Sequence, residues 1–198
     1  MPLIYLASAS PRRSQLLDQI GVGHRIVPLD LDESRWAGES PAAYVERLAR
    51  AKAGALWDRL PEAERHPVLG ADTTVALGDE VFGKPGDRGD ALAMLSRLAG
   101  RTHQVYTGVA LRTASGCAAR LSTSEVTFGR LTPAQCAAYW STGEPIGKAG
   151  GYAVQGRAAA FITRIEGSYS GIMGLPLAET AELLSLAGLF DSGLPLER

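Results

Sequence analysis

The chain has 198 residues, 45% of them hydrophobic, and a formal net charge of −1 from 20 Lys and Arg against 21 Asp and Glu. This hydrophobic content is typical of a folded domain and excludes a disordered chain. The balanced charge argues against nucleic-acid binding, and no uncharged apolar run approaches the ~20 residues that span a bilayer. We therefore expect neither a nucleic-acid nor a membrane partner.

The first residues and the cysteines indicate the compartment. The apolar run at the start precedes Arg12 and Arg13, which is the reverse of the order in a secretory signal. Cys117 and Cys136 form no CxxC pair, which favours a reducing compartment. We expect a cytoplasmic protein. The length predicts a single domain, which we place at 1–190, followed by a C-terminal tail at 191–198.

The first third of the chain predicts a strand, a helix, a second strand and a long helix. Ser10 followed by Pro11 predicts a helix start with a hydroxyl N-cap, and Gly21 ends that helix. The strands are expected at 3–7 and 26–29, with an acidic loop at 30–33. A second Ser-Pro pair, at 40–41, opens a helix to residue 57. Side chains at helical spacing predict its apolar face, namely Tyr44, Leu48, Ala51 and Ala55.

The rest of the chain mixes strands with shorter helices. We expect a strand at 68–71 that runs into Asp72 and on to 75–77, then a tight turn and a strand at 80–82. Thr132 and Gln135 predict a capping box. The remaining elements are a helix at 90–98, a long hairpin of 104–111 with 120–128, helices at 133–140 and 176–187, and a strand at 161–165. Without regular alternation, the pattern favours a mixed α/β sheet flanked by helices over a doubly wound one.

The segment SASPRR, where the first strand meets the first helix, predicts an anion site. Free backbone N–H groups at a helix start attract anions, and Ser8 and Ser10 add hydroxyls. Arg12 and Arg13 lie in the first helical turn, where cations normally oppose the helix dipole. A bound phosphate would explain this placement, whereas two solvated arginines after a good cap are an equally simple interpretation.

Carboxylates are the second candidate feature. Asp72 follows a buried strand, at what we predict to be its end, and Glu33 lies in the acidic loop. Asp30 and Asp32 in that loop are expected to be merely solvated. Oxygen ligands from one or two carboxylates, together with substrate phosphates, are the usual way to hold Mg²⁺.

Two glycine-containing turns complete the candidate site. Gly83-Lys84-Pro85 presents one lysine, and the turn at 151–156 presents Gln155 between two glycines that would let a ligand come close. Each pattern is also typical of an ordinary turn. The histidines show no metal spacing and are interpreted as surface or loop residues: His24, His66 and His103. The P-loop and dinucleotide-binding motifs are absent.

Six ordered segments together resemble the Maf family of nucleoside triphosphate pyrophosphatases: LASASPRR, RLARAKA, LGADTTV, GKP, KAGGYAVQG and EGSYSGIMGLPL. The resemblance implies the Maf/Ham1 fold, with an elongated sheet and a cleft between two lobes. It also implies metal-dependent cleavage between the α- and β-phosphates, with Mg²⁺ or Mn²⁺ as the cofactor, and a homodimer. One departure is Gly147, where relatives commonly carry Asp.

The resemblance also assigns roles to residues. Asp72 matches the family's proton acceptor. Glu33 matches an active-site position, and both carboxylates are implied to hold the metal ion. Lys52 and Lys84 match phosphate-facing lysines. Three further positions match those that separate the family's substrate classes and imply dTTP, UTP and modified uridine or cytidine triphosphates as substrates: Arg12, Thr73 and Gln155.

The chemistry of Gln155 agrees with that substrate class. A primary amide offers one donor and one acceptor, which pairs with the O4 and N3–H edge of uracil or thymine, whereas a carboxylate would suit guanine. Two alternatives stay open: a non-catalytic regulator of cell division, and a Ham1-like enzyme for inosine or xanthosine triphosphates. The cations add a further observation, because 17 are Arg and only 3 are Lys. All three lysines, Lys52, Lys84 and Lys148, fall in the matched segments, where we expect a tight phosphate pocket to exclude the wider Arg.

Overall fold

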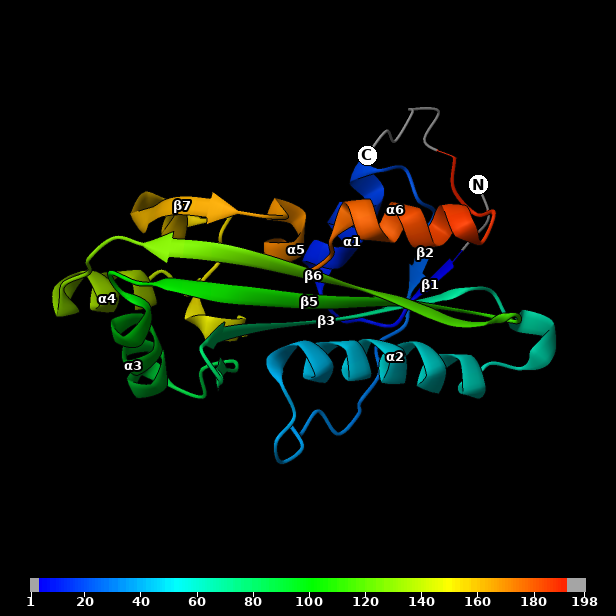
Figure 1. Ribbon diagram of the computed structural model, residues 1–198, viewed down its shortest axis with the longest axis horizontal. Coiled ribbons are helices and arrows are strands. Elements are labelled where there is room, and N and C mark those ends of the chain that lie inside the picture. Colours follow the sequence, from blue (N-terminus) through cyan, green and yellow to red (C-terminus); the bar gives the residue numbers. More distant parts are fainter. Residues whose placement is uncertain (1–3, 192–198) are drawn as a thin grey trace.

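The computed structural model describes residues 4–191 and consists of one seven-stranded mixed sheet flanked by helices, as predicted (Figure 1). The strands follow the order β2-β1-β3-β5-β6-β7, and β4 pairs with β3. The β1 strand is parallel to β2 and β3, and the other pairs are antiparallel. The strands are β1 (Ile4–Leu6), β2 (His24–Ile26), β3 (Val68–Leu77), β4 (Glu80–Phe82), β5 (Thr102–Thr113), β6 (Gly116–Phe128) and β7 (Ile162–Glu166).

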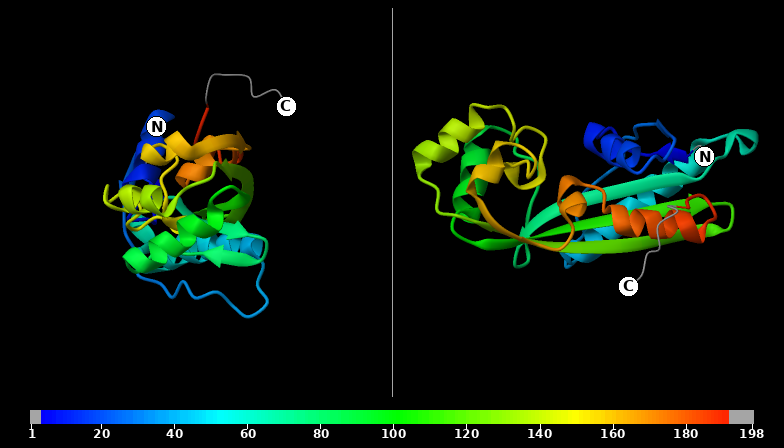
Figure 2. Two further views of the ribbon diagram at one scale, coloured as in Figure 1. Left: turned by 90° about the vertical axis from the view of Figure 1, so that its left-hand side faces the viewer. Right: turned by 90° about the horizontal axis from the view of Figure 1, so that it is seen from above.

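The helices lie on both faces and at one end of this sheet. The α-helices are α1 (Pro11–Gln19), α2 (Pro41–Arg59), α3 (Arg88–Leu98), α4 (Pro133–Trp140), α5 (Tyr169–Met173) and α6 (Leu177–Leu186). Three short 3₁₀ helices are η1 (Glu62–Glu64), η2 (Ala149–Gly151) and η3 (Arg157–Phe161). Figure 2 shows two groups of helices at opposite ends of the long strands, with α3 and α4 in one group and α1 and α6 in the other. No helix of the described residues is long and apolar enough to cross a membrane.

Three clusters of buried side chains hold these layers together. One lies between the sheet and helices α1 and α6, and a second lies on the opposite face, under α2. The third forms at the far end, around Phe128, where α3, α4 and the η2–η3 segment pack together. The long strands β3 and β5 contribute to more than one cluster, so they connect the two ends of the molecule.

Two glycines bring α2 unusually close to the sheet. A Cβ added at Gly70 would lie 2.3 Å from the Ala49 carbonyl oxygen, and one added at Gly108 would lie 2.5 Å from the Val45 carbonyl oxygen. Strand β5 places Gly108 directly opposite Asp72 in the sheet. Because neither strand has a side chain at these glycines, the backbone of α2 rests directly against the sheet. Lys52, on the same helix, can therefore reach Asp72.

The predicted face of α2 is right at Leu48, which is buried, and wrong at two other positions. Ala51 is exposed and Tyr44 is only half-buried, whereas the buried face runs from Val45 through Ala49 and Lys52 to Leu56. The helix is rich in alanine, so several faces show apolar spacing, and the sequence alone does not separate them. The end of the helix, two residues beyond the prediction, and the Ser40 cap, whose hydroxyl accepts from Ala43 N, agree with expectation.

Other predictions of local structure are confirmed at some positions and wrong at others. The β5–β6 hairpin and the capping box of Thr132 are confirmed, whereas the second strand lies at 24–26 rather than 26–29. Ser10 makes no side-chain cap; instead its own N–H donates to Ser8 Oγ at 3.2 Å. Asp72 lies in the middle of a ten-residue strand and not at its end. The single domain at 1–190 stays a prediction, and the tail at 191–198 falls, except for Asp191, outside the described residues.

Candidate active site

A cleft of about 550 Å³ lies where β3 passes between the two groups of helices, and every residue predicted to form the site lines it. The size suits a nucleotide-sized ligand. The ten residues come from six separate parts of the chain: Ser8, Ser10, Arg12, Arg13, Glu33, Lys52, Asp72, Thr73, Lys84 and Gln155. The structure thus brings together all the residues that the motifs singled out.

The cleft is strongly cationic although the chain is nearly neutral. Five cationic side chains line it against only two carboxylates: Arg12, Arg13, Lys52, Lys84 and Lys148 against Glu33 and Asp72. All three lysines of the chain are therefore in the cleft. Such a local excess of positive charge attracts a polyanion and favours its entry.

An open edge of β3 exposes the central residues of the site. Strand β1 pairs with β3 only up to Leu69, and β4 pairs only from Val75 onward. Because alternate residues of a strand point to opposite faces, Asp72 and Thr73 project to opposite sides of this edge. Asp72 points toward α2, and Thr73 points toward α1 and α5. One short stretch of strand thus places two different functional groups in the same cleft.

Lys52 joins the two carboxylates on the α2 side. Its Nζ lies 2.7 Å from Asp72 Oδ1 and 2.6 Å from Glu33 Oε1. Lys52 and Asp72 are each less than a tenth exposed, whereas Lys84 Nζ, 4.0 Å from Glu33 Oε2, has a side chain that is 66% exposed. A buried pair of this kind needs such close geometry to offset the loss of hydration. The expectation that every lysine occupies a tight pocket therefore holds for Lys52 and is wrong for Lys84.

The pKa of Glu33 lies below its ordinary value. Partial burial raises it, but the hydrogen bond and charge of Lys52, with Lys84 and Arg13, outweigh that effect. Glu33 therefore remains ionised at neutral pH, as a ligand for a cation requires.

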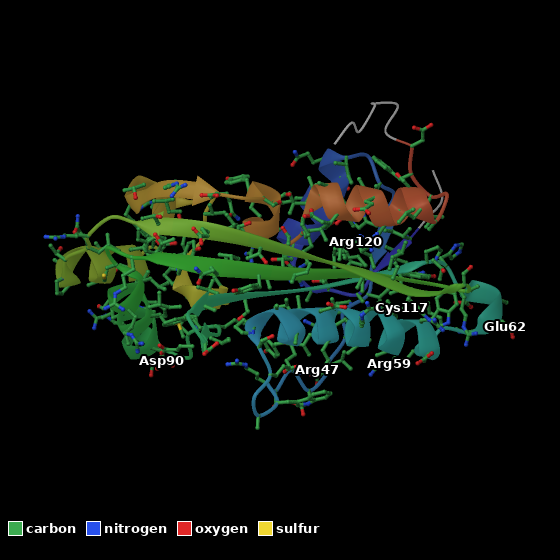
Figure 3. All side chains as sticks on the ribbon, viewed as in Figure 1. Arg47, Arg59, Glu62, Asp90, Cys117 and Arg120 are labelled. Carbon is green, nitrogen blue, oxygen red and sulfur yellow. The ribbon has the colours of Figure 1, made fainter. Side chains whose placement is uncertain are left out.

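The loop that carries Glu33 is fixed to α2. Tyr44 OH donates to the Glu33 carbonyl oxygen at 2.8 Å, and Arg47 Nε lies 2.6 Å from Glu39 Oε1. Arg47 also donates to the Ser34 carbonyl oxygen. Figure 3 shows Arg47 on the side of α2 toward this loop. Glu33 thus has a defined position although it lies outside any helix or strand.

On the other face of β3, Arg13 connects three parts of the chain. Its guanidinium donates to the Gly174 carbonyl oxygen at 2.7 Å, to Ser8 Oγ at 3.0 Å and to Thr73 Oγ1 at 3.3 Å. Burial lowers the pKa of Arg13, although Asp72 partly offsets this effect. Because its donors are used within the protein, Arg13 organises the cleft wall as much as it offers charge to a ligand.

Arg12 is held by a single contact, from Nε to the Met173 carbonyl oxygen at 3.2 Å. No other donor of this guanidinium makes a hydrogen bond within the described part of the chain, so its NH groups are available to a ligand. Thr73 is braced from β5, since Thr107 Oγ1 lies 3.0 Å from Thr73 Oγ1 and 2.8 Å from the Gly171 carbonyl oxygen.

The glycines before Gln155 serve packing within the protein. Gly150 has φ +67°, and a Cβ there would lie 2.9 Å from the side chain of Val75. Its N–H donates to the Gly83 carbonyl oxygen at 3.0 Å, so this turn rests on the turn that presents Lys84. At Gly150, which directly precedes the predicted turn at 151–156, the protein itself therefore makes the close approach.

His103, expected at the surface, is completely buried beneath the same turn. Its Nε2 lies 2.8 Å from Tyr152 OH, and its ring packs edge-on against Phe128. Burial lowers the pKa of His103 to about 4. An isolated histidine in a strand carries no sequence signal for burial beyond its alternation with apolar neighbours, here Val105 on the same face.

Sequence reasoning missed four contributors to the cleft. By residue type Tyr44 and Thr107 are ordinary helix and strand residues, and the carbonyl oxygens of Met173 and Gly174 leave no trace in side-chain chemistry. The motif EGSYSGIMGLPL contains Met173 and Gly174 and is the one signal for them in the sequence. These groups position other residues, which explains why residue type alone does not reveal them.

The donor set fits a divalent cation that arrives with a phosphate ligand. Among the described residues, no group of three or more His, Cys, Asp or Glu side chains is placed to hold a metal ion. The cleft offers two carboxylates, Glu33 and Asp72, which are hard oxygen donors. Mg²⁺ is usually held by one or two carboxylates and by substrate phosphates, so these residues suit it.

Comparisons with known proteins agree with these motifs. The family described as Maf-like protein matches residues 3–187. The dTTP/UTP pyrophosphatase of Xanthomonas oryzae pv. oryzae (strain MAFF 311018) is 54% identical over 188 residues, which cover 94% of this chain and 99% of that protein. The dTTP/UTP pyrophosphatase of Albidiferax ferrireducens is 52% identical over 193 residues, with 93% and 96% covered.

Solved structures resemble the chain more distantly. A HAM1 protein from Coxiella burnetii has 16% identity and a TM-score of 0.43, covering 66% of this chain and 75% of that one. A dITP/XTP pyrophosphatase from Mycobacterium abscessus has 19% identity and a TM-score of 0.40, covering 65% and 74%. The match at 3–187 and relatives that share half of their residues along nearly their whole length show that the chain belongs to the family of Maf-like proteins.

Proposed function

We propose that this protein is a nucleoside triphosphate pyrophosphatase that hydrolyses dTTP and UTP to the monophosphate and pyrophosphate. The observation that carries the proposal is identity of 50–54% to relatives named dTTP/UTP pyrophosphatase, over at least 92% of this chain. The cationic cleft supports it independently, because it combines charge for a triphosphate with a carboxylate that can accept a proton. Modified uridine or cytidine triphosphates belong to the same proposed substrate class.

Asp72 is the proposed proton acceptor. Lys52 occupies Oδ1, and Oδ2 makes no hydrogen bond to the residues that the structure describes, so it is available to orient and deprotonate a water molecule. Such general-base catalysis typically contributes about 10²–10⁴-fold to a rate. The ion pair with Lys52 keeps the carboxylate in place when the cleft is empty, and this preorganisation favours attack at the phosphorus.

The cations are proposed to bind the triphosphate. Lys52 and Lys84 approach from one side of β3, and Arg12, with Ser8 and Ser10, from the other, so the phosphate oxygens would be contacted from both walls. Glu33 and Asp72 would hold Mg²⁺ or Mn²⁺, which supplies positive charge against the phosphate oxygens when it is bound. Phosphoryl transfer depends mostly on such positioning and charge stabilisation.

Base selection is proposed to rest on Gln155, with Thr73 and Arg12. Gln155 is exposed and lines the cleft, and the described residues provide no hydrogen-bond partner for its amide. Its donor and acceptor complement the O4 and N3–H edge of uracil and thymine. Buried polar groups that are mismatched with a wrong base can give selectivity of about 10⁴.

The test is a panel of triphosphates incubated with the purified protein and Mg²⁺, Mn²⁺ or EDTA, with monophosphate and pyrophosphate quantified. We expect dTTP and UTP to be hydrolysed far faster than GTP, 7-methyl-GTP and ITP, with activity lost in EDTA. Asp72→Asn is expected to lower kcat by at least about a hundredfold. Exposed Asp30, in the acidic loop, supplies the matched control Asp30→Asn, which keeps activity. Preference for ITP, or near-normal turnover by Asp72→Asn, would contradict the proposal.

Two further properties belong to the same proposal. The free thiols Cys117 and Cys136 support a cytoplasmic location, where thiols stay reduced. The family resemblance supports a homodimer, which light scattering of the purified protein measures directly. A monomer at assay concentrations would contradict the dimer without affecting the proposed chemistry.

A further inference from the structure

The turn that presents Gln155 is fixed by neighbouring side chains at both ends. Within the turn, Gly156 N donates to the Ala153 carbonyl oxygen at 3.0 Å, which closes a short loop with Gln155 exposed at its tip. A backbone loop with a single internal hydrogen bond has many conformations of similar energy, so an external contact is needed to select one of them.

The first contact comes from α4. Tyr139 OH accepts a hydrogen bond from Ala153 N at 3.1 Å, and both residues are buried. Burial raises the pKa of Tyr139 well above its usual value, so the phenol keeps its proton. The same hydroxyl can therefore donate to a second acceptor while its oxygen accepts from the turn.

The second contact comes from Glu144, in the loop after α4. Its carboxylate accepts from Arg157 N, which lies 3.0 Å from Oε1 and 2.8 Å from Oε2. The carboxylate also lies directly over Gly156, where an added Cβ would be 2.3 Å from Oε2. Gly156 is therefore required because it leaves room for Glu144, and not only because glycine admits a ligand.

The two contacts hold opposite ends of the same turn. Tyr139 binds the residue before Val154, and Glu144 binds the residue after Gly156. A half-buried carboxylate whose two oxygens both accept from Arg157 N is held in a defined position. Gln155 lies between these two fixed points, although the described residues provide no hydrogen-bond partner for its amide.

We propose that Glu144 is a positioning residue for base selection, which holds the turn at 153–156 so that the Gln155 amide faces the base edge of the nucleotide. This inference rests on the proposed function, since it assumes that Gln155 reads the base. Glu144 does not touch the phosphates in this scheme. Its removal therefore affects discrimination between bases and spares the binding of the phosphate chain.

The test compares Glu144→Ala with Glu144→Gln. In the alanine variant Arg157 N loses its acceptor, and we expect selectivity for UTP over CTP and GTP, measured as ratios of kcat/KM, to fall about 10- to 100-fold. The glutamine variant keeps one oxygen acceptor for Arg157 N, and selectivity is expected to return to within about threefold of wild type. Glu182→Ala, which removes an ion pair with Arg120 far from the cleft, is the matched control and keeps wild-type selectivity.

Inhibition by tripolyphosphate, which has no base, separates positioning from general damage. The inhibition constant is expected to change by less than about twofold in every variant, because the phosphate-binding residues are untouched. Equal loss of activity on all substrates together with weaker tripolyphosphate inhibition would overturn the proposal, as would unchanged selectivity in Glu144→Ala or failure of Glu144→Gln to restore it. If Glu144→Ala does not fold, Tyr139→Phe removes the other contact and is expected to lower the same selectivity ratio.

The wild-type panel distinguishes the two levels of inference. If the wild-type protein prefers a base other than uracil or thymine, the proposed function fails, and the Glu144 variants are then scored on the base that it does prefer. If wild type prefers UTP and dTTP but the variants keep that preference, only the role of Glu144 fails.

Discussion

Acidification is expected to destabilise this protein through His103. The ring is fully buried, its Nδ1 has no hydrogen-bond partner among the described residues, and Nε2 pairs with the neutral Tyr152 hydroxyl. An imidazolium needs acceptors for two N–H groups, and this site provides at most one. The folded state therefore binds the proton more weakly than the unfolded chain does.

The sign and size follow from the two pKa values. Burial lowers the pKa of His103 to about 4, from 6.5 in the unfolded chain. Stability is therefore unaffected above about pH 6.5 and falls as the pH drops from there toward 4, because the unfolded state takes up the proton first. The complete effect amounts to about 3 kcal/mol, and about 2 kcal/mol is already lost at pH 5.

Urea unfolding followed by tryptophan fluorescence at pH 8 and pH 5 measures this loss. Carboxylates also titrate, Glu33 among them, so the informative quantity is the difference between wild type and His103→Gln. The glutamine keeps a neutral hydrogen bond to Tyr152 but does not titrate, and we expect it to lose about 2 kcal/mol less than wild type between the two pH values. Equal losses in the two proteins would refute the assignment of a neutral buried histidine.

Two further predictions concern how α2 carries Lys52 to the cleft. Gly70→Ala places a Cβ against the Ala49 carbonyl oxygen and is expected to cost about 1–3 kcal/mol of unfolding free energy and to lower activity, because the helix must move outward. Gly54→Ala is the control, because Gly54 lies on α2 itself and a Cβ there meets open space. It should stabilise the protein by up to about 1 kcal/mol in the same urea assay. Lys52→Arg is expected to lower kcat at least about a hundredfold, since the wider group does not fit between two carboxylates, whereas Lys84→Arg, on an exposed side chain, should stay within about tenfold. Equal losses in both arginine variants would contradict the difference in burial.

Elements with local signals were predictable from the sequence. The Ser40 cap, the capping box of Thr132 and the β5–β6 hairpin depend on residues that are adjacent or a few positions apart, and each appears as expected. The site could also be anticipated, because short motifs indicated which residues belong together. The motifs did not indicate how the residues meet. Asp72 and Thr73 point to opposite sides of the part of β3 that neither β1 nor β4 covers. This gap depends on where the pairing with β1 ends and the pairing with β4 begins, which only the folded sheet shows.

The wrong predictions for local structure and burial mostly share one physical cause. The contact that decides the outcome is made by the tertiary fold and not by the local sequence pattern. Ser10 looks like a cap, but Ser8 accepts its N–H and is itself held by Arg13. The buried face of α2 depends on the glycines of β3 and β5, more than ten residues away. His103 is buried because Tyr152 and Phe128 close over it. Tertiary contacts of this kind override local preference, and residue type does not reveal them.

The alternation along the open edge of β3 also limits how this protein can vary. Asp72 and Thr73 are consecutive, so inserting or deleting one residue anywhere between Leu69 and Val75 would exchange the faces to which the acid and the hydroxyl point. Asp72, the proposed proton acceptor, would then face α1, and only a compensating shift in the same stretch would restore it. Length variation among relatives should therefore be absent from this stretch and should collect at the far hairpin around Ser115, where an extra residue alters no position in the cleft.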